Sequence, residues 1–240
     1  MIGFDVRAAA RAAEHARVGA SRRTLLMGFG ALALSGCFLP VSRLRYRLTL
    51  YFKVNGAARE FWTDIELRYT DNTNAPLPIH DHLRCIGQAI IADFDEPVGP
   101  IVGLLGRIPI DYSAYVWPER LFLPDEKSRF SFRSPAEKVE FLKERLKTET
   151  RLPDDLAPSF VRFADLTDWL SVEEVTAESL VFISDGAIEF VAATVVYTDR
   201  PSSKGIEARL PWLKRREVSF RSLANQRLRE GLSRGHFQLR

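Results

Sequence analysis

The feature that most restricts the fold is a pair of long alternating segments on either side of Asn55-Gly56. In residues 44–54 every second residue is apolar, and residues 59–69 largely repeat this pattern. Because strand side chains alternate between the two faces of a sheet, each segment has one apolar and one polar face. Asn-Gly suits a type I′ turn, in which both central residues have positive φ. We therefore predict a long antiparallel hairpin with one face on a core and the other in water.

The rest of the chain predicts more strands and one well-defined helix. Ser134-Pro135 precedes apolar residues at spacings of three and four, which predicts a packed helix at about residues 135–149. A short helix is also expected near the C-terminus. The predicted fold class is α+β, with mainly antiparallel strands. Further strands are expected in short apolar or alternating runs at residues 86–94, 160–163, 171–175, 181–183 and 188–198, and residues 98–105 form either a strand or a buried turn.

The first 36 residues carry the whole excess of positive charge. The chain has 34 basic and 31 acidic residues, which gives a net charge of +3. Residues 1–36 contain 5 arginines and 2 acidic residues, so the remaining chain has 29 basic residues (34 less 5) and 29 acidic residues (31 less 2). A globally basic surface is therefore not expected, and nucleic acid is not a predicted partner.

Residues 21–37 have the layout of an export signal. Arg22 and Arg23 precede an uncharged apolar run, and small residues end that run directly before Cys37. The run has about 12 residues, fewer than the roughly 20 that cross a bilayer as a helix. We therefore expect residues 1–36 to be a signal peptide that is removed, and not a stable membrane span.

Two parts of this signal resemble known motifs. Arg22 and Arg23 resemble the pair in twin-arginine signals, which direct a protein to an export route. Residues 34–37, Leu-Ser-Gly-Cys, resemble the lipobox of bacterial lipoproteins. In that family the cysteine receives a diacylglyceryl group, the signal is cut before the cysteine, and the new amine is usually acylated. The resemblance implies palmitate at Cys37 and a membrane-anchored chain that faces the periplasm.

The expected domain organisation follows from this anchor. After the signal peptide at residues 1–36 we expect a lipidated tether at 37–43, one globular domain at 44–213 and a basic tail at 214–240. The tail could lie on anionic lipid or lipopolysaccharide. Phe38 follows the cysteine where inner-membrane lipoproteins of enteric bacteria have aspartate, which resembles an outer-membrane destination.

Two separated segments form a second set of motifs. Residues 43–54 read RLRYRLTLYFKV, and residues 158–163 lead on to GIEARLPWL at 205–213. This layout resembles a group of small, uncharacterised proteobacterial proteins, many of them lipoproteins. They begin with an amphipathic YRLTV strand and end near a GIEKRLPWL segment. The resemblance covers much of residues 43–213, and it implies an architecture and a compartment but no catalytic residues.

His80, His82 and Cys85 are the candidate metal ligands. In an extended segment His80 and His82 point the same way and could bind one ion, and Cys85 could add a thiolate. Structural zinc takes four ligands and catalytic zinc takes three with a water, so a further ligand would have to come from elsewhere. The alternative interpretation is a polar loop that enters a strand, with Cys85 as a small buried apolar residue.

Other motifs for chemistry are weak. The sequence has no Gly-x-Ser-x-Gly elbow and no glycine-rich phosphate loop. The acidic residues 93–96 could bind calcium, although they lack the spacing of a calcium loop. The polar face of the hairpin and the aromatic residues Tyr112, Tyr115 and Trp117 could form a partner surface, or the aromatic residues could belong to the core.

We therefore expect a non-catalytic envelope lipoprotein that binds another protein or an envelope component. The alternative is a metal-dependent envelope enzyme that uses His80 and His82. No cofactor other than that metal is expected.

Overall fold

The computed structural model describes residues 41–70, 82–109, 114–123, 125 and 131–239. All of them belong to the second of two units into which the chain divides, Pro40–Arg240. The predicted signal peptide, Arg22, Arg23 and Cys37 lie outside the described residues, as does His80.

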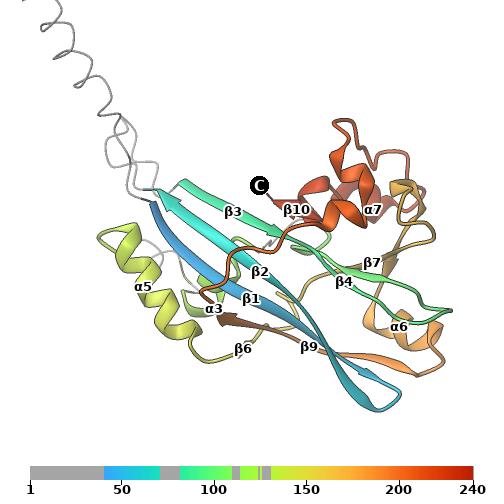
Figure 1. The fold of residues 1–240 in the computed structure, drawn as a ribbon, viewed down its shortest axis with the longest axis horizontal. Helices are drawn as coiled ribbons and strands as arrows, with labels where there is room; N and C mark the ends of the chain where they lie inside the picture. The colour runs from blue at the N-terminus through green and yellow to red at the C-terminus, as the bar shows by residue number, and fades with distance from the viewer. Residues whose placement is uncertain (1–40, 71–81, 110–113, 124, 126–130, 240) are drawn as a thin grey trace, which may run out of the picture. The chain divides into compact units, whose positions relative to one another are not determined.

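The predicted hairpin is present and is the longest strand pair of the fold (Figure 1). It consists of β1 (Val41–Val54) and β2 (Ala57–Thr70). Asn55 has φ 49° and Gly56 has φ 83°, as a type I′ turn requires. The apolar face of β1 is at most 1% exposed, which confirms the predicted alternation on this side of the sheet. Its members are Leu44, Tyr46, Leu48, Leu50 and Phe52.

The hairpin lies at the centre of a six-stranded antiparallel sheet with the order β10-β3-β2-β1-β9-β6. A second antiparallel sheet has the order β4-β5-β7-β8. The strand predicted at residues 86–94 is divided, because the chain passes from one sheet to the other at Ala89. The remaining strands are β3 (His82–Gln88), β4 (Ile90–Ala92), β5 (Ile101–Gly103), β6 (Thr150–Arg151), β7 (Phe160–Phe163), β8 (Val172–Val175), β9 (Ile188–Tyr197) and β10 (Gln238–Leu239).

The four-stranded sheet is apolar on both faces. Ile101 and Phe160 pack in the core beneath β1, whereas Val102 and Val161 pack in a second core on the opposite side. Strands that are covered on both faces have continuous apolar sequences, which explains why residues 101–105 show no alternation. A Cβ on Gly103 would lie 2.5 Å from Leu50 Cδ1, so glycine allows β5 to approach β1 closely.

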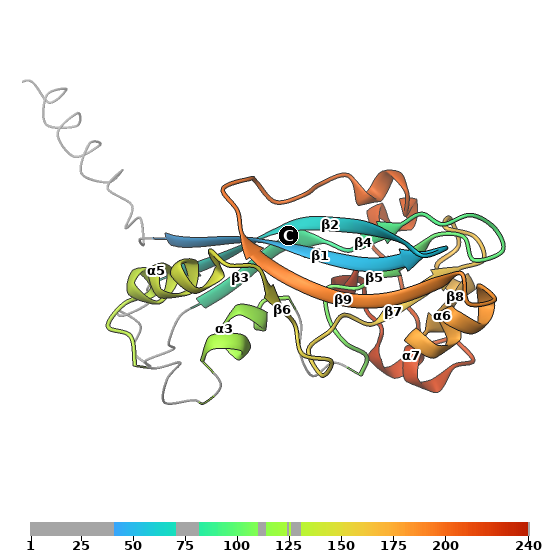
Figure 2. The ribbon, with the colours of Figure 1, turned by 90° about the horizontal axis from the view of Figure 1, so that it is seen from below.

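Helices α5 (Pro135–Leu146) and α3 (Trp117–Phe122) cover the same face of the six-stranded sheet (Figure 2). The predicted helix is confirmed, and it ends three residues before the expected boundary. Ser134 Oγ accepts a hydrogen bond from Glu137 N at 3.3 Å, which caps the start of α5. Together with the two antiparallel sheets, these helices confirm the α+β class.

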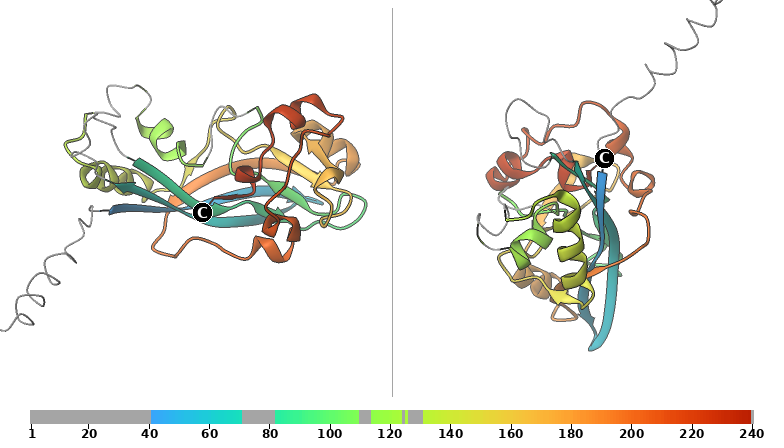
Figure 3. Two further views of the ribbon diagram at one scale, coloured as in Figure 1. Left: turned by 90° about the horizontal axis from the view of Figure 1, so that it is seen from above. Right: turned by 90° about the vertical axis from the view of Figure 1, so that its left-hand side faces the viewer.

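Residues 214–239 do not form the basic tail that we predicted. They contain α7 (Gln226–Gly231) and the edge strand β10, and they lie at the opposite end of the six-stranded sheet from α5 (Figure 3). Their apolar side chains fill the second core and cover the outer face of the four-stranded sheet. The buried members are Phe220, Leu223, Leu228, Leu232 and Phe237. The other short helices are α6 (Ala177–Ile183), η1 (Trp169–Ser171), η2 (Ile206–Ala208), η3 (Pro211–Lys214) and η4 (Arg234–His236). The strand predicted at residues 181–183 is wrong, because the capping box at Thr176 and Ser179 starts α6, which continues through these residues.

The polar face of the hairpin is only partly in water, contrary to our prediction. Asp64 and Glu66 are each 3% exposed, because arginine side chains cover them. The segment of residues 198–205, which we call the strap, arches over this face (Figure 2). It is fixed there by Ser203, whose N donates to Asp64 O at 2.9 Å and whose Oγ accepts from Asp64 N at 2.9 Å.

Candidate functional site

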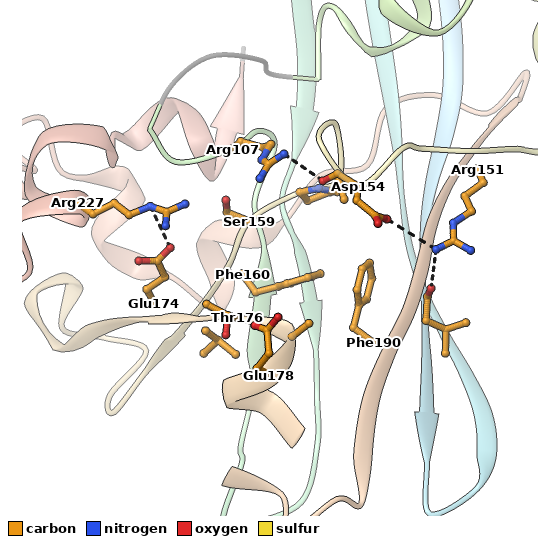
Figure 4. Close-up of a pocket in the computed structure, with 15 residues that line it drawn as sticks. Arg107, Arg151, Asp154, Ser159, Phe160, Glu174, Thr176, Glu178, Phe190 and Arg227 are labelled. Atoms are coloured by element: carbon orange, nitrogen blue, oxygen red, sulfur yellow. Dashed lines mark hydrogen bonds and ion pairs between the residues drawn. The ribbon is translucent and has the colours of Figure 1, made fainter. Parts of the chain in front are cut away.

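A cavity of about 460 Å³ lies between the two sheets (Figure 4). Its walls come from β7, β8 and β9, from the first residues of α6, and from Arg227 of α7. This volume falls within the range of about 300–1,000 Å³ that is usual for small-molecule sites. We therefore treat this cavity as the candidate functional site.

Two phenylalanines form the apolar floor of the cavity. Phe160 of β7 and Phe190 of β9 meet edge to face, with ring centroids 4.8 Å apart and planes at 64°. Phe52 of β1 lies behind both, at 5.9 Å from Phe160 and 5.5 Å from Phe190. Because these rings join the two sheets through the core, the floor of the cavity is held in a fixed position.

Three arginines surround this floor, and each comes from a different part of the chain (Figure 4). Arg107 Nη1 donates to the backbone oxygen of Asp154 at 3.0 Å. Arg227 donates to the backbone oxygen of Ile108 from Nε at 3.1 Å and from Nη2 at 2.5 Å. Arg151 Nη2 lies 3.4 Å from Val191 O. A carbonyl group holds a guanidinium in place without cancelling its charge.

The lining also contains three carboxylates, Asp154, Glu174 and Glu178, which equal the three arginines in number. Glu174 Oε1 is 3.3 Å from Arg227 Nε, and its side chain is 16% exposed. Asp154 Oδ1 is 3.8 Å from Arg151 Nη2, but both side chains are well exposed, at 97% and 63%. An exposed ion pair of this length contributes little to stability. Arg151 can therefore exchange Asp154 for an acidic ligand at low cost.

The residues around the cavity offer an apolar surface and charged groups that could bind a ligand. None of the described residues that line the cavity is a histidine or a cysteine. Ser159 Oγ accepts a hydrogen bond from Ile108 N at 3.0 Å, so this hydroxyl is engaged in holding the backbone. A serine nucleophile needs an adjacent base, and the lining residues provide none in contact with Ser159.

The predicted metal ligands are not brought together by the described part of the structure. Cys85 of β3 is 8% exposed and lies in the main core. Burial raises the pKa of its thiol to about 12, so this thiol is protonated at neutral pH when no metal is bound. His82 is the first residue of β3, in register with Thr70. No group of three or more metal-ligating side chains occurs among the described residues, and the site at His80 and His82 stays a prediction.

The other candidate residues differ in their surroundings. Asp93 accepts hydrogen bonds from Arg209 Nη1 at 3.0 Å and Nη2 at 2.7 Å, and this guanidinium lowers the pKa of the Asp93 carboxyl. Trp117 is fully buried, whereas Tyr115 is 44% exposed. Tyr112 lies outside the described residues.

The cavity could not be recognised in the sequence. Phe160, Phe190 and Arg227 are separated by more than 25 residues each and share no motif. The sequence predicts strands at Phe160 and Phe190, but it does not indicate that these strands face each other across a cavity. It predicts that Arg227 belongs to the basic tail.

Comparison with known proteins gives no relative on which to base a function. No protein-family model matches the chain, and neither a curated protein nor a solved structure matches it. In the part of the chain that the structure describes, no helix is both long enough and apolar enough to cross a membrane. A function for this chain therefore has to be inferred from its own residues.

Proposed function

We propose that the mature chain is a lipid-anchored protein of the bacterial cell envelope that acts by binding and not by catalysis. The anchor is Cys37, at the end of the apolar run that resembles a lipobox. The observation that carries the binding function is the cavity, in which three arginines surround a rigid aromatic floor. The periplasmic side of the outer membrane is the proposed location, as Phe38 suggested.

The cavity favours a ligand with an apolar or aromatic body and an acidic group. The rings of Phe160 and Phe190 offer an apolar surface, and a guanidinium binds carboxylate, sulfonate or phosphate oxygens in a two-pronged geometry. Arg151 is the arginine best placed to accept such a group, since it is 63% exposed and is only weakly paired.

A fluorescent aromatic anion tests this proposal. The full chain carrying Cys37→Ser is titrated with anilinonaphthalene sulfonate, and the dissociation constant is compared with that of the same chain carrying Arg151→Ala. We expect Arg151→Ala to weaken binding by about tenfold, which corresponds to about 1.4 kcal/mol. Arg216→Ala, which removes an equal charge from an exposed position, is the matched control and should leave the affinity unchanged.

Circular dichroism and thermal unfolding show whether the variants keep the fold. Equal affinities in the parent, Arg151→Ala and Arg216→Ala chains would show that the probe does not use the cavity, and the proposed binding function would then be rejected.

A further inference from the structure

Three arginines lie side by side across the outer face of the six-stranded sheet, and we call them the arginine row. Arg43 of β1 is directly opposite Arg68 of β2, and Arg68 is directly opposite Arg84 of β3. Neighbouring strands are about 4.8 Å apart, so the row extends for about 10 Å. Like charges in opposed positions destabilise a sheet. Glu66 already pairs with Arg68, and an anion that binds across the row would offset more of this repulsion.

The carboxylates closest to the row lie beneath the arginines. Glu66 accepts hydrogen bonds from Arg45 Nε at 2.6 Å and from Arg68 Nε at 2.5 Å. Asp64 accepts from Arg47 Nε at 2.9 Å and from Arg47 Nη2 at 3.2 Å. Both carboxylate side chains are 4% exposed, whereas the side chains of Arg45, Arg47 and Arg68 are 23–36% exposed. Around Asp64 and Glu66, a ligand that approaches the face therefore meets guanidinium groups before it meets these two carboxylates.

The charge of this half of the face is clearly positive. Among the described residues of β1, β2 and β3, this half of the face has five arginines and two carboxylates. The strap adds Arg200 and Lys204, both exposed, against Asp199. The basic members of the strands are Arg43, Arg45, Arg47, Arg68 and Arg84, and the acidic members are Asp64 and Glu66.

The arginine row lies at the end of the sheet at which the chain enters it. β1 begins at Val41, beside the ends of β2 and β3, and runs toward the turn at the far end (Figure 1). Cys37 precedes Arg43 by six residues, and six fully extended residues span at most about 20 Å. A lipid group on Cys37 would therefore hold the row close to the membrane surface.

We propose that the arginine row binds the phosphate groups of anionic lipids in the membrane that holds the anchor. This inference rests on the proposed lipid anchor, because the anchor is what brings the phosphate groups of membrane lipids near the row. Guanidinium groups bind phosphate oxygens through paired N–H donors, and basic residues near an anionic surface add to the affinity of a lipid chain. The outer face of the sheet then lies toward the bilayer, and the four-stranded sheet with its cavity lies on the side away from it.

Vesicle binding tests this proposal independently of the lipid group. The full chain carrying Cys37→Ser is sedimented with vesicles of phosphatidylcholine, alone or with one part in four of phosphatidylglycerol. The same chain is then compared with a variant that also carries Arg43→Ala and Arg84→Ala. The matched control carries Arg216→Ala and Arg221→Ala, which remove the same charge from exposed positions of the C-terminal segment.

We expect the parent chain to bind the anionic vesicles and not the neutral ones. In the variant of the row, the partition coefficient for anionic vesicles should fall by about 10- to 30-fold. The control should fall by less than about threefold, because its charges lie far from the proposed contact. Arg43→Ala alone should give a smaller loss in the same direction. Thermal unfolding verifies that the variant of the row keeps the fold.

Equal losses in the two double variants would overturn the proposal, because net charge and not the row would then govern binding. Equal binding to neutral vesicles would also overturn it. Inorganic phosphate that displaces the chain from anionic vesicles at millimolar concentration would indicate a site for a free anion, which is a different function. None of these results affects palmitate labelling at Cys37, so a failure of the row and a failure of the anchor can be told apart.

Discussion

At the scale of single residues, Glu66 is the charge on which the polar face of the hairpin depends. Burial raises the pKa of its carboxyl, but the hydrogen bonds from Arg45 and Arg68 outweigh this effect, and the pKa lies below its usual range. The folded state therefore holds the proton less tightly than the unfolded state. The ionised Glu66 carboxylate stabilises the fold fully at pH values above the pKa that Glu66 has in the unfolded chain. This stabilisation is lost as the pH falls through the lower pKa that Glu66 has in the folded state.

We expect Glu66→Gln to lower the free energy of unfolding by about 1–3 kcal/mol at pH 7, since two guanidinium groups lose their shared acceptor. The difference between Glu66→Gln and the wild type should shrink as the pH falls below about 4.3, where the unfolded carboxyl takes up its proton. Urea unfolding at neutral and acidic pH measures this difference.

Glu140→Gln is the matched control for this experiment. Glu140 pairs with Lys143 on the exposed side of α5, and its side chain is 71% exposed. Loss of such a pair should cost at most about 0.5 kcal/mol at any pH. If Glu66→Gln proves as mild as this control, the buried carboxylate does not hold the arginines as described.

The sequence indicated which face Asp64 and Glu66 occupy but not that they are buried. Alternation assigned both residues correctly to the polar side of the hairpin. Their burial depends on which arginines lie opposite them and on Ser203 in the strap, more than 130 residues later in the chain. Periodicity contains no information about such distant partners.

At the scale of elements, the C-terminal segment shows why a basic composition does not make a tail. Its charged residues outnumber the apolar ones, and the apolar ones follow no helical or strand period. Most of its apolar side chains nevertheless fill the second core, which the four-stranded sheet would otherwise expose. In contrast, the hairpin and α5 have regular periods and turn or capping residues, and both could be predicted.

Gly231, the last residue of α7, tests this packing. A Cβ at this position would lie 2.6 Å from Ile108 Cγ2 and 3.2 Å from Pro109 Cα. The first contact involves a branched, fully buried side chain and the second involves backbone, so neither can move freely. We expect Gly231→Ala to destabilise the protein by about 1–3 kcal/mol, as overpacking generally does. Denaturant unfolding measures the change.

Gly235→Ala is the control, because its Cβ would meet its nearest neighbours at 3.5 Å and 3.7 Å, which are ordinary contacts. It should change stability by less than about 0.5 kcal/mol. A mild effect of Gly231→Ala would instead indicate that the C-terminal segment is loosely attached, as a basic tail would be.

At the scale of the whole molecule, the fold class could be predicted, whereas the candidate site could not. The class follows from local patterns that recur along the chain. The cavity forms only because β7 and β9 belong to two sheets that pack together, and because α7 brings Arg227 to its edge. The cavity is built from residues that lie far apart in the sequence, whereas the proposed anchor is a short contiguous motif that ends at Cys37 and that the sequence alone indicates.

The anchor and the two surfaces together suggest how the molecule would be oriented. In the proposed arrangement, a lipid on Cys37 would hold the start of β1 at the membrane, and the arginine row would place the outer face of the sheet toward anionic lipid. The four-stranded sheet and its cavity would then lie on the side away from the bilayer. The row and the cavity would have separate roles, one toward lipid and one toward the ligand.

The most direct test of this account is metabolic labelling of the full chain with palmitate, combined with membrane fractionation. The wild type should incorporate the label and sediment with membranes. Cys37→Ser should abolish the label and lower the membrane-bound fraction, while Cys85→Ser, which alters the buried thiol of β3, should leave labelling unchanged. Labelling that persists in Cys37→Ser, or a wild type that takes up no palmitate, would contradict the proposed lipid anchor.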